Sequence, residues 1–74
     1  MEQYKNLSGK SGVRAFELGT DSIRVQFTSG SIDTYTNTSA GSTHIARMKQ
    51  LARDGSGLNG YITRYVRDGY ASHT

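Results

Sequence analysis

Apolar and polar side chains alternate over residues 22–27, where isoleucine, valine and phenylalanine at positions 23, 25 and 27 are separated by polar residues. A period of two is typical of a β-strand that buries one face. Ser29-Gly30 follows as a two-residue turn, in which glycine is free to take a positive φ. The pattern therefore predicts a β-hairpin whose second strand covers residues 31–36.

The length of the turn fixes the register, and the register decides which side chains share a face. With a two-residue loop, positions 24 and 25 lie opposite positions 35 and 34. The prediction gives the hairpin one apolar face, made of Ile23, Val25, Phe27 and Ile32. Its other face then holds Arg24, Gln26, Asp33 and Tyr35.

The flanking segments complete the predicted fold. Residues 13–18 form a short strand that turns directly into the hairpin, which gives a three-stranded antiparallel meander. Downstream, apolar residues recur at helical spacing in two segments, the first ending at Gly55 and the second at Gly69. We therefore expect an α+β domain in which two helices cover the apolar face of the meander. The most buried side chains should be Ile23, Val25, Phe27, Ile32, Met48, Leu51, Leu58, Ile62 and Val66.

Length and periodicity predict one domain with two unstructured ends. A chain of 74 residues is near the size at which only ~60% of the unfolded surface is buried on folding, so we expect it to gain stability as a homo-oligomer. Residues 1–11 show no period and are expected to form a loose arm. Residues 12–70 form the domain, and residues 71–74 a tail.

Composition narrows the chemistry. There is no cysteine, and neither His44 nor His73 has an acid spaced to orient it, so we predict no metal, no cofactor and no catalytic activity. No apolar run approaches the ~20 residues of a membrane span, and a cytoplasmic protein is expected. The net charge of +3 favours anionic partners.

Arginines and tyrosines supply the candidate ligand-binding residues. Tyr35 faces Arg24 across the predicted hairpin, on the side away from the helices, as a stacking platform for a single-stranded base. Arg64 and Arg67 are three residues apart on the second helix, with Tyr61 one turn before Arg64. The alternative is a cross-strand cation–π pair that needs no ligand, with the helical tyrosines packing against the core.

Two segments resemble the KTSC domain, a small domain found at the C-terminus of some lysyl-tRNA synthetases and alone in bacterial and phage proteins. Gly30–Thr36 is similar to the family's central strand, and Gly55–Ile62 to its glycine, aromatic-Asn and isoleucine pattern. The resemblance spans residues 11–70. Asp33 stands where the family has the first tyrosine of a Tyr-x-Tyr motif, and the loop before the first helix is longer. What the resemblance implies about function is limited to conjectured RNA binding.

Two functions follow as alternatives. In the first, the protein is a non-catalytic oligomeric binding module, which binds a partner or traps a nucleotide-like or phosphorylated ligand, with Tyr35 and Arg24 as interface anchors. In the second, it is an accessory domain that binds RNA or another single strand. Asp33 beside Tyr35 disfavours phosphate, so we favour the first function for the sheet face and assign an anion to the arginines of the second helix.

Overall fold

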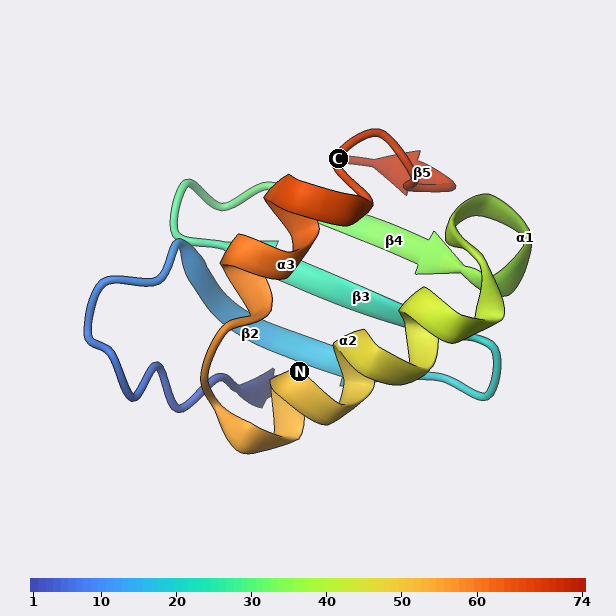
Figure 1. The fold of residues 1–74 in the computed structure, drawn as a ribbon. Coiled ribbons are helices and arrows are strands. Elements are labelled where there is room, and N and C mark those ends of the chain that lie inside the picture. The colour runs from blue at the N-terminus through green and yellow to red at the C-terminus, as the bar shows by residue number, and fades with distance from the viewer.

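The computed structural model describes residues 1–74 and shows an antiparallel sheet with helices packed on one face (Figure 1). The five strands lie side by side in chain order, and the three helices come between the fourth strand and the fifth. The predicted α+β class is confirmed, and two short edge strands extend the predicted three. The strands are β1 (Glu2–Gln3), β2 (Val13–Leu18), β3 (Ser22–Phe27), β4 (Ile32–Thr36) and β5 (Ser72–His73); the helices are α1 (Asn37–Ala40), α2 (Ser42–Asp54) and α3 (Leu58–Tyr65).

The loop between β3 and β4 is one residue longer than predicted. The amide of Phe27 donates to the carbonyl oxygen of Ser31, and the amide of Gly30 donates to that of Phe27, both at 2.9 Å. These bonds enclose a three-residue loop, residues 28–30, in which a turn is followed by a left-handed residue. The positive φ predicted for Gly30 is confirmed at 97°, whereas the two-residue turn is wrong.

This difference of one residue exchanges the two faces of β4, because side chains alternate along a strand. Tyr35 pairs with Ile23 and Asp33 pairs with Val25, so Tyr35 and Asp33 point beneath the helices. Tyr35 is fully buried, and Asp33 is the buried acid of the core. Ile32 instead lies on the outer face, where it is half-buried. The predicted division of the hairpin into an apolar and a polar face is therefore wrong for β4.

The core lies between the sheet and the helices α2 and α3. Six of the nine predicted core residues are buried: Ile23, Val25, Met48, Leu58, Ile62 and Val66. Three are only partly buried: Phe27, Ile32 and Leu51. The prediction missed five large buried side chains, namely Tyr4, Val13, Phe16, Tyr35 and Ile45.

Glycine and valine mark the ends of the two longer helices. α2 stops at Gly55, which has a φ of 76° and whose amide donates to the carbonyl oxygens of Leu51 and Ala52, as predicted. α3 ends earlier than the predicted Gly69. The amide of Val66 still donates to Ile62, but the φ of Val66 is −130°, so the backbone has left the helix there.

Both ends of the chain pair with the sheet, which differs from the loose arm and tail expected for residues 1–11 and 71–74. β1 adds to the edge of β2, and Tyr4 behind it is buried. The Tyr4 hydroxyl accepts a hydrogen bond of 3.3 Å from the amide of Leu58, at the start of α3. At the opposite edge β5 pairs with β4. The two termini therefore lie at opposite edges of the sheet, beside β2 and β4.

Candidate functional site

The predicted stacking platform of Tyr35 and Arg24 is not formed, because the two side chains lie on opposite faces of the sheet. Tyr35 is buried, and its hydroxyl donates to Oδ2 of Asp33 over 3.3 Å. Burial, and then the neighbouring carboxylate, raise the pKa of Tyr35 well above its ordinary value. Arg24 lies on the outer face and forms an exposed ion pair of 2.8 Å with Glu17, of a kind worth ~0–1 kcal/mol.

Asp33 and Tyr35 belong to a cluster that joins β4 to the end of the chain. We call Asp33, Tyr35, Tyr70 and His73 the β4–β5 cluster. Asp33 Oδ1 is hydrogen-bonded to Nδ1 of His73. The ring of Tyr70 packs edge-on against Tyr35 at 6.4 Å and lies 5.4 Å from the ring of His73. The expectation that His73 has no acid to orient it is therefore wrong, and the exchanged faces of β4 explain the error.

A second aromatic cluster lies on the helical face, where Tyr65 is exposed and His44 and Tyr61 are half-buried. Tyr61 and Tyr65 are four residues apart on α3 and so lie on the same side of it, with ring centroids 4.7 Å apart. His44 reaches them from the first turn of α2. A hydrogen bond of 2.7 Å joins its Nδ1 to the Tyr61 hydroxyl, and its ring stacks on Tyr65 at 6.0 Å and 26°. We call His44, Tyr61 and Tyr65 the α3 aromatic cluster.

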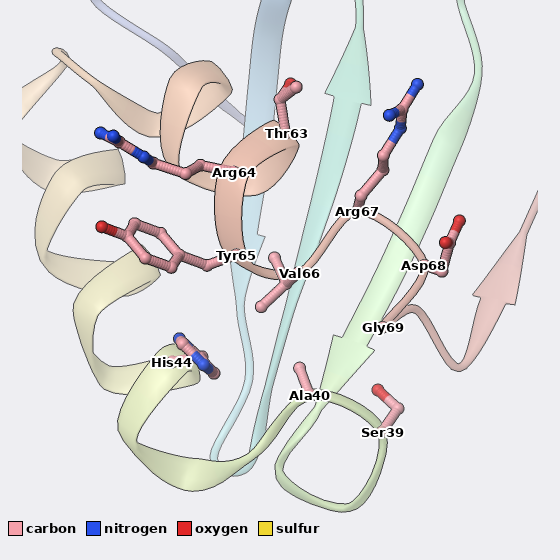
Figure 2. Close-up of a pocket in the computed structure, with 10 residues that line it drawn as sticks. All are labelled: Ser39, Ala40, His44, Thr63, Arg64, Tyr65, Val66, Arg67, Asp68 and Gly69. Carbon is pink, nitrogen blue, oxygen red and sulfur yellow. The ribbon is translucent and has the colours of Figure 1, made fainter.

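Arg64 adds a positive charge to this cluster. Its Cζ atom lies 5.9 Å from the centroid of the Tyr65 ring, within the range of a cation–π contact. Figure 2 shows Arg64 and Tyr65 pointing to one side of α3, and Arg67 projecting away from them. Arg67 follows the end of α3, so the prediction that Arg64 and Arg67 are neighbours on one helical face is wrong.

Arg64 and Arg67 nevertheless line the same groove, which we call the terminal groove. It has a volume of about 490 Å³ and lies where the end of α3 meets the start of α2 (Figure 2). One acid, Asp68, lines it with the two arginines. Its lining residues are Ser39, Ala40, His44, Thr63, Arg64, Tyr65, Val66, Arg67, Asp68 and Gly69.

A second hollow of about 350 Å³ lies between α2 and α3, and we call it the inter-helix groove. Arg47 of α2 and Arg64 of α3 line it, and none of its lining residues is acidic. Leu51 and the rings of Tyr61 and Tyr65 supply apolar surface. Its lining residues are Arg47, Leu51, Gly57, Gly60, Tyr61, Arg64 and Tyr65.

The sequence therefore identifies part of the surface that holds the terminal groove and the inter-helix groove. Three predicted residues, Tyr61, Arg64 and Arg67, line one or other groove. Helical spacing places Tyr65 with the core residues Leu58, Ile62 and Val66, but Tyr65 is 55% exposed. A histidine in the first turn of a helix is expected to be solvated, but His44 is half-buried against the two tyrosines. The spacing of four residues between the two tyrosines was the available signal, whereas the approach of His44 depends on how α2 and α3 cross.

Comparisons with protein families, curated proteins and solved structures find no match to this chain. The resemblance to the KTSC domain therefore stays a prediction. Nowhere in the structure do three or more histidine, aspartate or glutamate side chains gather in a way that could hold a metal ion. None of the helices combines the length and the apolar character needed to cross a bilayer.

Proposed function

We propose that this protein is a non-catalytic binding module that takes an anionic ligand with a planar ring, such as a nucleotide, on the face formed by α2 and α3. The exposed ring of Tyr65 carries the proposal. Tyr65 as a whole residue is 55% exposed, and the guanidinium of Arg64 and the ring of His44 lie about 6 Å from its ring centroid. An exposed ring beside a guanidinium is the arrangement with which proteins bind bases and phosphates together.

Charge supports an anion at this face. The two grooves together are lined by Arg47, Arg64 and Arg67 but by a single acid, Asp68. The whole chain carries a net charge of +3, which favours encounter with anions. The planar, forked guanidinium group also suits phosphate oxygens, to which it can donate two parallel hydrogen bonds.

A binding role is preferred to catalysis because of how the histidines are used. His44 Nδ1 is engaged by the Tyr61 hydroxyl, and His73 Nδ1 by the Asp33 carboxylate. Every hydrogen bond made by a serine or threonine hydroxyl goes to the backbone or to another hydroxyl. A nucleophilic hydroxyl needs a base within hydrogen-bonding reach, so the proposal includes no covalent chemistry.

The α2–α3 face is also preferred to self-association through the outer face of the sheet. Tyr35, the aromatic anchor on which that interface depended, is buried beneath the helices. Arg24, the other anchor, is already paired with Glu17. The homo-oligomer and the cytoplasmic location stay predictions, and the KTSC-like assignment remains part of the proposal.

The test is a fluorescence-anisotropy titration of the protein into a labelled single-stranded oligonucleotide. Tyr65→Ala should weaken binding by about 1–3 kcal/mol, the usual contribution of one stacked base. Tyr65→Phe should bind like the wild type, because no hydrogen bond of the Tyr65 hydroxyl is present and the ring is kept. Tyr70→Ala is the matched control, since Tyr70 is also exposed but lines neither groove. Equal binding by wild type and Tyr65→Ala would contradict the proposal.

A further inference from the structure

We infer that the ligand of the α2–α3 face is a single strand of several nucleotides and not a free mononucleotide; this inference rests on the proposed function. The observation behind it is that the face carries two hollows, not one. The terminal groove and the inter-helix groove share the side chains of Arg64 and Tyr65. Tyr65 therefore stands at the junction of two ligand-sized spaces.

Each groove has the volume and the charge for a nucleotide unit of its own. Their volumes of about 490 and 350 Å³ both lie in the range of ~300–1,000 Å³ that is typical of small-molecule sites. Each groove also adds one arginine that the other lacks, Arg67 in the terminal groove and Arg47 in the inter-helix groove. A mononucleotide would use one of these arginines and leave the other without an anionic partner.

The length of the face fits a short strand. The two grooves run from Gly57, just before α3, to Gly69, just after it. α3 has eight residues, and at 1.5 Å per residue it is roughly 12 Å long. A stacked strand advances about 3.4 Å per nucleotide, so the helix alone accompanies about three or four nucleotides. The base nearest the middle would stack on Tyr65, and phosphates on either side would contact arginines.

The experiment compares strands of increasing length on the full chain. The probes are thymidine monophosphate and thymidine oligonucleotides of two, four and eight units, titrated at two salt concentrations. We expect the affinity to rise several-fold from one to four units and to change little from four to eight. The slope of log affinity against log salt should steepen by roughly 0.7 for each further phosphate contacted.

Single arginine variants locate the strand on both grooves. Arg47→Ala and Arg67→Ala should each lower the affinity for the four-unit strand several-fold and flatten the salt dependence of that affinity. At most one of them should affect the monophosphate, which reaches one groove at a time. Arg53→Ala is the matched control, because it removes the same charge from an exposed position of α2 that lines neither groove.

The outcomes separate the inference from the function on which it rests. Two results would overturn the inference while leaving nucleotide binding in place. One is equal affinity for one and four units; the other is that only one of Arg47→Ala and Arg67→Ala weakens binding of the four-unit strand. If the wild type binds none of the four probes, the proposed function is overturned, and the inference with it. Length dependence together with sensitivity to both arginines would support a strand that crosses Tyr65.

Discussion

Two clusters in this protein combine tyrosines with a histidine, and they differ in what surrounds them. In the β4–β5 cluster, Tyr35 is fully buried, and Asp33 binds both Tyr35 and His73. In the α3 aromatic cluster, Tyr65 is largely exposed and the charged neighbour is Arg64. The same residue types thus stabilise the packing of the sheet in one place and form an open surface in the other.

The sign of the neighbouring charge separates the two clusters further. The carboxylate of Asp33 is an acceptor for the Tyr35 hydroxyl and would repel an incoming phosphate. The guanidinium of Arg64 attracts phosphate, and Tyr65 beside it is 55% exposed. A tyrosine near a histidine therefore does not by itself indicate a ligand site. An exposed tyrosine beside a positive charge favours one for an anion.

The largest expected effect compares the two tyrosines directly. Tyr35→Ala should cost about 3–5 kcal/mol, as truncation of a buried aromatic side chain does, which is close to the whole stability of a small domain. Tyr65→Ala should change the free energy of unfolding by only about 0.5 kcal/mol, as most surface substitutions do. Urea unfolding followed by circular dichroism measures both. A comparable loss in the two variants would remove the distinction between the clusters.

Alkaline pH should act on the buried cluster through Tyr35. Its pKa is raised in the folded protein, so above about pH 10 the unfolded chain loses this proton while the folded chain keeps it. The contribution of Tyr35 to stability is therefore fully present below pH 10 and is lost as the pH rises toward the raised pKa. Urea midpoints measured from pH 9 to 12 should fall more steeply for the wild type than for Tyr35→Phe. Parallel curves would show that Tyr35 is not the group responsible.

The three longer strands and the helices α2 and α3 could be predicted from the sequence because their periods are clear. The short elements β1, β5 and α1 could not, and neither could the faces of β4. Two-residue and three-residue hairpin loops both accept Ser-Gly, and the two lengths place opposite faces toward the core. The pattern of β4 does not decide between them, since Ile32 and Tyr35 are both large and point to opposite sides. Either loop therefore buries one large side chain, and only the packed structure distinguishes them.

The candidate site was partly predictable for a similar reason. Tyr61 and Arg64 lie on one side of α3 by spacing alone. α3 ends at Tyr65, which is exposed, whereas Val66 directly after it has left the helical conformation and is buried. The contact between His44 and Tyr61 joins residues seventeen positions apart and follows from the packing of α2 on α3. Periodicity predicts which residues share a helical face but not which face remains open.

The smallest expected effect concerns Asp68, the acid that lines the terminal groove. If phosphates occupy this groove beside Arg67, the Asp68 carboxylate repels them, and Asp68→Asn should tighten strand binding. Repulsion between two exposed negative charges at a protein surface is weak, so the gain should be about 1 kcal/mol or less and should shrink as salt is added. Asp21→Asn is the matched control, because Asp21 is exposed and lies outside both grooves. An equal gain from both variants would mean that net charge, and not the terminal groove, governs binding.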